Sequence, residues 1–284
     1  MVRLAFVLIV SFLTAIFAQA DLQERSYPGF KLWVDCSERL TKVVYYALTK
    51  DSGNAKRPSG YKRDKAAEAS CTQLSSKPYQ GSITAQFPND KSKKYDVGHI
   101  VNANHMDSSE EAIKASMYMV NMFPQVSEFN RQKGAWYYTE LLSECLRDLT
   151  DLKIYAGTII GSDSSDDYFV ESHGVRTPDW AWKAIYRIDT NSVQAYLMPN
   201  RLGVLGANVG DYVVSFDTLL GSLEEDESRA ILEPLRAANN DMNLWIVEGK
   251  NKLTCGGEPS SIVGGRIRKR SARMCDSVVV CILC

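Results

Sequence analysis

The stretch 94–140 constrains this chain more than any other part of its sequence. Within it, His99 follows Gly98 at the end of a short run that passes from polar to apolar residues. Glycine has no Cβ, so another group can approach the backbone closely at that point. We therefore expect a strand that ends at His99, with the polar residues that follow in the same stretch gathered near its end.

Three more elements are expected in this stretch. The run Ser108-Ser109-Glu110-Glu111 offers a hydroxyl cap and two acids, a pattern typical of a helix start. Residues 117–123 are apolar and predict a buried strand that the following proline closes. Apolar residues recur at roughly helical spacing over 128–149, which predicts one long helix with Asn130 and Glu140 at or near its start.

These residues resemble the motifs of the DNA/RNA non-specific endonuclease family, whose core is the ββα-metal (His-Me) finger. The family's three motifs are matched in order and in approximate spacing by Asp96-Val97-Gly98-His99, by Asn121-Met122-Phe123-Pro124-Gln125, and by Asn130, Gly134, Trp136 and Glu140. The likeness covers residues 30–225 and includes the pattern Thr177-Pro178, Trp182-Lys183 and Pro199-Asn200 in the second half. It implies an α+β fold, in which a central antiparallel sheet carries flanking helices and a ββα-metal unit on one side.

Two departures from the family's pattern bear on activity. Val97 replaces an arginine, which removes one candidate phosphate contact, and two extra residues lie between Asn130 and Gly134. The resemblance implies an endonuclease that cuts DNA and also RNA with little sequence preference. The alternative is a catalytically impaired, secreted nucleic-acid-binding protein on the same fold. A serine hydrolase is disfavoured because the chain has no Gly-x-Ser-x-Gly elbow.

Phosphodiester hydrolysis needs an activated water molecule and neutralisation of the phosphoryl charge. His99 is the expected general base, since a neutral imidazole can take a proton from water. Asp96 would orient that ring or hold the strand end. Asn130 offers a carbonyl oxygen suited to Mg²⁺, or to Mn²⁺ or another divalent ion, and Glu140 would bind a metal-bound water or orient Asn130.

Other polar residues receive lesser roles. Asn121 and Gln125 are expected to brace the site rather than to touch the metal. Arg57, in the basic loop 56–63, is a candidate substrate-binding residue, although a solvated turn fits that loop equally well. His105 is expected to be partly buried and structural, and His173 to be exposed.

The ends of the chain predict targeting and processing. A basic start, an apolar run and the small-x-small sequence Ala18-Gln19-Ala20 form the pattern of a secretory signal peptide over residues 1–20. The apolar run is short for a membrane anchor, so we expect a secreted protein without stable membrane association. Residues 21–255 would form the endonuclease domain. Residues 256–284 form a basic, cysteine-containing tail, in which Arg266 to Arg270 resembles a proprotein-convertase cleavage site, although a disordered basic tail fits equally well.

Composition adds two constraints. The net charge is −1, or −2 once Arg3 is removed with the signal peptide, so only a local basic cleft would serve nucleic-acid binding. The first four cysteines of the expected mature chain could form two disulfides in three connectivities; they are Cys36, Cys71, Cys145 and Cys255.

Outside the central stretch, alternation and apolar runs predict strands at 43–48, 153–160, 180–189 and 194–198. An amphipathic helix is expected at 224–238. The acidic loop 162–167 fits a solvated loop better than a calcium site, because no bidentate acid follows at the proper distance.

Overall fold

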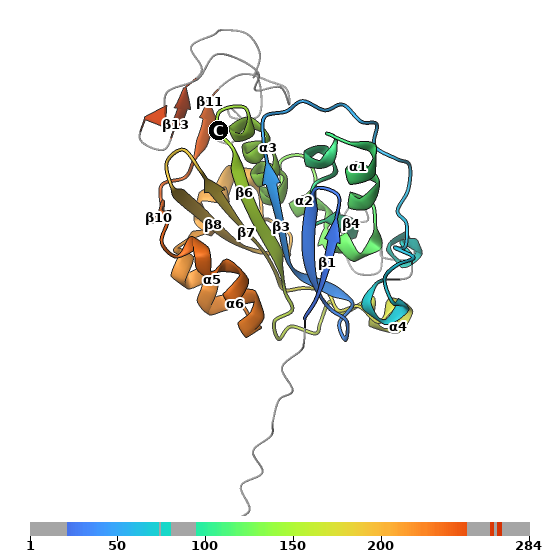
Figure 1. Ribbon diagram of the computed structural model, residues 1–284. Coiled ribbons are helices and arrows are strands. Elements are labelled where there is room, and N and C mark those ends of the chain that lie inside the picture. Colours follow the sequence, from blue (N-terminus) through green and yellow to red (C-terminus); the bar gives the residue numbers. More distant parts are fainter. Residues whose placement is uncertain (1–21, 74, 81–94, 249–261, 264–265, 269–284) are drawn as a thin grey trace, which may run out of the picture.

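The computed structural model describes residues 22–73, 75–80, 95–248, 262–263 and 266–268. Its centre is a sheet in the order β1-β2-β3-β6-β7-β8-β10, with β9 paired to β8 (Figure 1). Neighbouring strands are antiparallel except β10, which runs parallel to β8. The strands are β1 (Leu22–Tyr27), β2 (Phe30–Asp35), β3 (Leu40–Leu48), β6 (Leu152–Ile159), β7 (Trp180–Arg187), β8 (Ser192–Pro199), β9 (Val213–Val214) and β10 (Asn239–Asn240). The expected α+β class with a central antiparallel sheet is confirmed.

The four strands predicted outside the central stretch are all present as β3, β6, β7 and β8. Strands β7 and β8 pair in register from Trp180 opposite Pro199 to Arg187 opposite Ser192. The alternation in β7 separates two hydrophobic clusters. Ala181 and Ile185 belong to one cluster, and Trp182 and Ala184 to the other, as expected when successive side chains point to opposite faces.

Each face of the sheet is covered by its own helices (Figure 1). The larger cluster includes side chains of α1 (Glu110–Ser116) and α3 (Ala135–Arg147), and the smaller one includes side chains of α5 (Phe216–Ser222) and α6 (Asp226–Leu232). The predicted start of α1 is confirmed, because the Ser109 hydroxyl accepts a hydrogen bond from the backbone N–H of Ala112 at 3.0 Å.

A separate two-stranded antiparallel sheet holds the motif residues. It pairs β4 (Tyr95–His99) with β5 (Met122–Val126). The predicted strand 117–123 was wrong in position, because Met119–Asn121 form a 3-10 helix and Pro124 lies inside β5 rather than after it. Both strands of a two-stranded sheet are edges, so a residue without an N–H can be accommodated there.

The single long helix predicted for 128–149 was also wrong. The structure has α2 (Ser127–Asn130) and α3, separated by four residues. Lys133 has a φ of 77°, in the left-handed region, which interrupts the helix. Gly134 then packs so closely that a Cβ there would lie 2.0 Å from the Phe129 carbonyl oxygen. Asn130 therefore ends one helix, whereas Glu140 lies in the second turn of the next.

The C-terminal part differs from the expected helix 224–238. Helix α6 ends at Leu232 and a 3-10 helix, Glu233–Leu235, follows, because Pro234 has no N–H to continue the α-helix. Three short strands pair in the order β11-β13-β12; they are β11 (Ile246–Glu248), β12 (Ile262–Val263) and β13 (Arg266–Arg268). A remaining short helix, α4, spans Val170–His173.

The predicted signal peptide and most of the basic tail lie outside the described residues. No helix in the described part of the chain is long and apolar enough to span a membrane.

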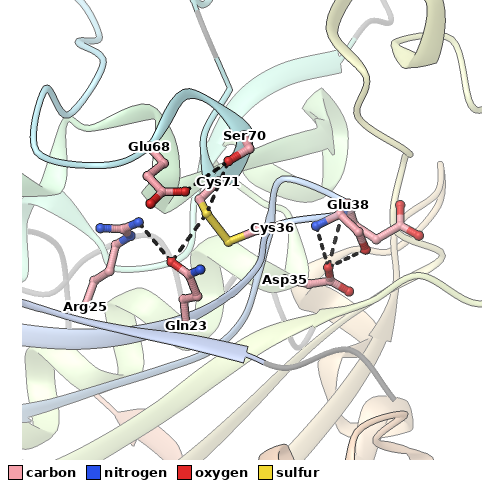
Figure 2. Close-up of a disulfide and its surroundings, with 9 residues drawn as sticks. Gln23, Arg25, Asp35, Cys36, Glu38, Glu68, Ser70 and Cys71 are labelled. Carbon is pink, nitrogen blue, oxygen red and sulfur yellow. Dashed lines mark hydrogen bonds between the residues drawn. A yellow bond between two sulfur atoms is a disulfide. The ribbon is translucent and has the colours of Figure 1, made fainter. Parts of the chain in front are cut away.

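A disulfide joins two segments of the chain that both precede β4 in the sequence. Cys36, just after β2, is bonded to Cys71 (Figure 2). The turn at Cys36 is also tied down by Asp35, whose carboxylate accepts hydrogen bonds from the backbone N–H groups of Ser37 and Glu38. The Cys36–Cys71 bond selects one of the three connectivities for the first four cysteines. Cys145 is disulfide-bonded as well, and Cys255 lies outside the described residues.

Candidate active site

A cleft of about 740 Å³ gathers residues that are far apart in the sequence. It lies where β4 ends, between the segment that follows β3 and the helices α2 and α3. Polar and charged residues dominate its lining: Arg57, Asp96, His99, Asn102, Asn104, His105, Asn130, Arg131, Glu140 and Glu144. The structure thus brings together in the cleft lining the predicted residues His99, Asp96, Asn130, Glu140 and Arg57. The two supporting residues, Asn121 and Gln125, are buried and do not line the cleft.

His99 is half-buried at the end of β4. Its Nε2 lies 3.4 Å from Met117 Sδ, and its ring centroid lies 5.7 Å from that of Tyr61. Burial, and to a lesser extent the positive charge of Arg57, lowers the pKa of His99 to about 3. The imidazole is therefore neutral at neutral pH. With Nε2 placed against the sulfur, Nδ1 has no hydrogen-bond partner among the described residues, so its lone pair is free to accept a proton.

Asp96 does not orient His99, contrary to one of the roles expected for it. Residues three apart on a strand point to opposite faces, and the Asp96 carboxylate turns instead towards the end of α2. It accepts a hydrogen bond from Asn130 Nδ2 at 3.1 Å and two from the Arg131 guanidinium at 2.8 and 2.6 Å. Asp96 therefore fixes the Asn130 amide, with its nitrogen end held and its oxygen end left for another partner.

The donor set suits a hard divalent ion. No cluster of three or more His, Cys, Asp or Glu residues in the described ranges is arranged to hold a metal, so a site here would depend on few protein ligands. Mg²⁺ binds in that way, because it keeps several waters and takes oxygen ligands. Asn130 Oδ1 has no hydrogen-bond partner in the described part of the chain, and it lines the cleft. The residues present therefore fit a divalent ion held mainly by Asn130 and water.

Glu140 lines the same cleft from the second turn of α3 and is half-buried. Burial raises the pKa of Glu140 above its ordinary range, and the charge of Lys183 and a hydrogen bond from Asn102 oppose that rise. Lys183 is not part of the cleft lining. Its side chain approaches α3 from the sheet side.

Asn121 and Gln125, which were expected to brace the site, differ in their hydrogen bonds. Asn121 is fully buried, and its side chain bonds both backbone groups of Val101 and the carbonyl of Ser116, each at 2.9 Å. It clamps the segment that follows His99. Gln125 is fully buried opposite Asp96 in the β4–β5 ladder, and neither of its side-chain polar atoms has a hydrogen-bond partner among the described residues. A Cβ at Gly98 would lie 2.1 Å from Gln125 Oε1, so the glycine is required there.

Basic residues enter the cleft at two points. Arg57 is exposed and lines it, and its charge acts on both His99 and Glu140. Arg131 is a cleft residue that the sequence analysis missed, although its place directly after Asn130 was the available signal. Val97, where the family has arginine, is 9% exposed and belongs to the larger hydrophobic cluster. The side chain at position 97 is therefore mostly buried, although it reaches the cleft lining.

The other two histidines are structural, but one prediction about them was wrong. His105 is buried; its Nδ1 lies 3.0 Å from the Tyr46 hydroxyl and its Nε2 lies 3.3 Å from both the Glu140 carbonyl and Glu144 Oε2. Burial lowers the pKa of His105 to about 3 and raises that of Glu144 to about 7. His173 was expected to be exposed, yet it is 7% exposed and packs edge-on against Tyr79.

The acidic loop 162–167 is held by protein contacts. Asp166 accepts a hydrogen bond from the Tyr95 hydroxyl at 2.9 Å, and Asp167 pairs with Arg176 at 2.8 Å. Two of its acids are thus half-buried and occupied by neighbouring side chains, whereas residues 162–165 are exposed.

The chain is similar to known proteins in its fold and in its match to a family model. No curated protein matches the chain significantly. Among solved structures, a chain of the crystal structure of the EndoG/EndoGI complex, described under the mechanism of EndoG inhibition, has a similar fold. The TM-score is 0.52 and the identity 21%, over 70% of this chain and 83% of that one. The family model for DNA/RNA non-specific endonuclease matches residues 13–221. The chain belongs to the DNA/RNA non-specific endonuclease family.

Proposed function

We propose that this protein is a secreted endonuclease that hydrolyses phosphodiester bonds of DNA and RNA with the help of a divalent metal ion, Mg²⁺ in the first place. One observation carries the proposal. A neutral, half-buried imidazole and an amide oxygen whose orientation is fixed by a carboxylate line the same cleft. These are the two groups that water activation and metal binding require.

Each cleft residue has its own role in the proposed hydrolysis. His99 Nδ1 takes the proton from the attacking water, because its lone pair is free and its ring is neutral. Asp96 holds the Asn130 amide so that Oδ1 is presented to the ion. A divalent ion, when bound, neutralises charge on the phosphoryl oxygens and on the leaving oxygen. Glu140 lines the same cleft from α3 and would hold water of the ion's hydration shell.

The lack of sequence preference follows from the chemistry of the contacts. Arg57 and Arg131 are charged groups suited to phosphate, and contacts to phosphate and sugar carry no direct sequence information. A net charge of −1 does not prevent this, because the two guanidinium groups create a local positive field at the cleft.

The test is digestion of supercoiled plasmid and of a structured RNA across a series of Mg²⁺, Mn²⁺ and Ca²⁺ concentrations, with EDTA as the metal-free control. Asn130→Ala should raise the Mg²⁺ concentration needed for half-maximal rate, whereas Asn54→Ala, at an exposed asparagine outside the cleft lining, should leave it unchanged. Cleavage of neither nucleic acid with any ion, together with retained binding, would establish the catalytically impaired alternative. Equal metal curves for Asn130→Ala and the parent would remove Asn130 as a ligand.

Secretion is supported by the sequence of residues 1–20 and by the disulfide Cys36–Cys71, which is typical of an oxidising compartment. We expect secreted material to begin at Asp21 and a fraction of it to end at Arg270. Intact-mass measurement on secreted protein decides both ends. A single full-length species that begins at Met1 would contradict both cleavages.

A further inference from the structure

Lys183 lies at a position of β7 where the alternation of side chains predicts an apolar residue. In β7 it lies between Ala181 and Ile185, which belong to the same hydrophobic cluster as Trp136 of α3. The lysine is only 1% exposed. An ammonium group removed from water is unfavourable unless other groups replace its hydration. The groups that surround this lysine therefore indicate why it is there.

Its direct partners are neutral and belong to one turn of α3. Lys183 Nζ donates a hydrogen bond to Thr139 Oγ1 at 2.9 Å and lies 3.9 Å from the centroid of the Trp136 ring. Among the described residues, no carboxylate forms an ion pair with it. A hydroxyl and an aromatic face solvate a cation only in part.

The compensating charge is that of Glu140. Thr139 and Trp136 stand one and four residues before Glu140, so the ammonium lies behind the turn of α3 that presents this carboxyl to the cleft. Burial lowers the pKa of Lys183 to about 8 and the Glu140 charge opposes that shift, while the Lys183 charge in turn favours the ionised form of Glu140. Charges without direct contact interact appreciably across an interior of low dielectric constant.

We propose that Lys183 is a positioning residue for the nuclease reaction: its buried ammonium holds the turn of α3 that contains Trp136 and Thr139, and it thereby places Glu140 at the cleft with a positive charge behind the same turn. This inference rests on the proposed function. It assigns to the sheet an electrostatic contribution to a site whose other residues come from the β4–β5 unit, from the helices and from the loop after β3.

The kinetic test is a double-mutant cycle with Glu140. Lys183→Met should lower kcat about 10- to 100-fold, the range for residues that support a site from outside it, with KM close to that of the parent. Lys183→Arg should retain more activity because it keeps the charge. In a Glu140→Gln background Lys183→Met should change kcat by less than about threefold, since the charge it serves is already gone. An equal loss in both backgrounds would mean that Lys183 only supports packing, and an undiminished kcat in Lys183→Met would remove it from the mechanism.

A second cycle needs neither metal nor substrate. Urea unfolding of the parent, Lys183→Met, Glu140→Gln and the double variant should show non-additive midpoints, because the two charges interact in the folded protein. Additive midpoints would overturn the inference even if the protein cleaves nucleic acid. Lack of cleavage by the parent would overturn the proposed function and leave this cycle readable. Thr139→Val serves as the matched variant that removes the hydrogen bond but keeps both charges, and it should reproduce less of the kcat loss than Lys183→Met.

Discussion

Lys42 and Lys183 are both buried lysines of the central sheet, but they are compensated in different ways. Lys42 of β3 is the extra residue of a β-bulge, where the pairing with β2 passes from Val43 to Thr41, and a bulge can redirect a side chain. Its ammonium forms ion pairs of 3.2 Å with Glu224 and 3.0 Å with Glu225, in the segment between α5 and α6. Lys183, on the side of α3, has a hydroxyl and an aromatic ring as its direct partners.

The two environments move the two pKa values in opposite directions. Burial lowers the pKa of Lys42, but Glu225 and Glu224 more than offset it, so the pKa of Lys42 is raised. For Lys183, burial prevails and the pKa falls to about 8. A charge with complete partners fixes the packing of the helices α5 and α6. The charge of Lys183, whose direct partners are neutral, acts on Glu140.

The comparison teaches that the two faces of the sheet have different tasks. On the face of α5 and α6, the buried Lys42 ammonium is paired with Glu224 and Glu225, and these ion pairs stabilise the fold. On the face of α3, the buried Lys183 ammonium has no ion-pair partner among the described residues, and neither side-chain polar atom of Gln125 has a hydrogen-bond partner there. Substitutions should therefore separate the two faces, with activity lost on one and stability lost on the other.

The largest expected effect is on the cleft side. His99→Ala should lower kcat about 10²- to 10⁴-fold, the usual cost of a lost general base, because no other neutral imidazole with a free nitrogen lies in the described cleft lining. Thermal unfolding should change little, since the ring is only half-buried. Single-turnover plasmid cleavage at saturating Mg²⁺ measures the rate. Turnover near that of the parent would remove His99 from the chemistry and would weaken the distinction between the faces.

The reverse result is expected on the other face. Lys42→Met leaves Glu225, whose side chain is 9% exposed, without its counter-charge, and loss of one partner of a buried ion pair costs about 3 kcal/mol of unfolding free energy. At a temperature where the variant is folded, kcat should equal that of the parent. Urea unfolding and plasmid cleavage on one preparation check both halves. A drop in kcat in fully folded Lys42→Met would show that the two faces are coupled.

Sequence reasoning located the cleft residues through their resemblance to family motifs. His99, Asn130 and Glu140 lie in motifs with fixed spacing, and the cap at Ser109 follows from a four-residue pattern. The break between α2 and α3 was missed because it depends on a left-handed Lys133 and on close packing of Gly134 against the Phe129 carbonyl. Such contacts are set by tertiary structure rather than by apolar periodicity.

Sequence reasoning mainly missed contacts between residues that are distant in the sequence. The Asp96–Arg131 pair joins residues 35 apart, and Lys183 meets Thr139 across 44 residues. His173 was expected in solvent because of its polar neighbours, but it packs against Tyr79 from a segment nearly a hundred residues earlier. A single sequence shows which side chains can pair, and the fold decides which of them do.

A smaller effect is expected at the residue that orients Asn130. Asp96→Ala removes the acceptor of Asn130 Nδ2 and should raise the Mg²⁺ midpoint about 10- to 100-fold, as for other residues that orient a metal ligand. Arg131→Ala is the matched control, because it breaks the exposed ion pair but leaves the Asp96–Asn130 hydrogen bond in place. That control should keep the parent's metal midpoint and raise KM. Equal midpoints in Asp96→Ala and the parent would show that Asn130 is held by its backbone alone.

The smallest expected effect concerns proton binding on the cleft side. The pKa of His99 is about 3 in the folded protein and near 6.5 in the unfolded chain. Below pH 6.5 the unfolded state binds a proton that folded His99 does not, so the stability that His99 contributes is complete above that pH and is lost progressively down to about pH 3. The difference amounts to about 1.4 kcal/mol per pH unit for one histidine. The slope of unfolding free energy between pH 6 and pH 4.5 should thus be shallower in His99→Ala than in the parent.

Glu144, with a pKa raised to about 7, stabilises the fold in its protonated form at low pH and so acts in the opposite sense. It is present in both proteins, so its contribution cancels in the comparison. Asn54→Ala, at an exposed asparagine outside the cleft lining, removes no titrating group and should keep the parent's slope. Parallel curves for His99→Ala and the parent would mean that the His99 ring is hydrated enough to keep an ordinary pKa, and the neutral base at the cleft would then need another explanation.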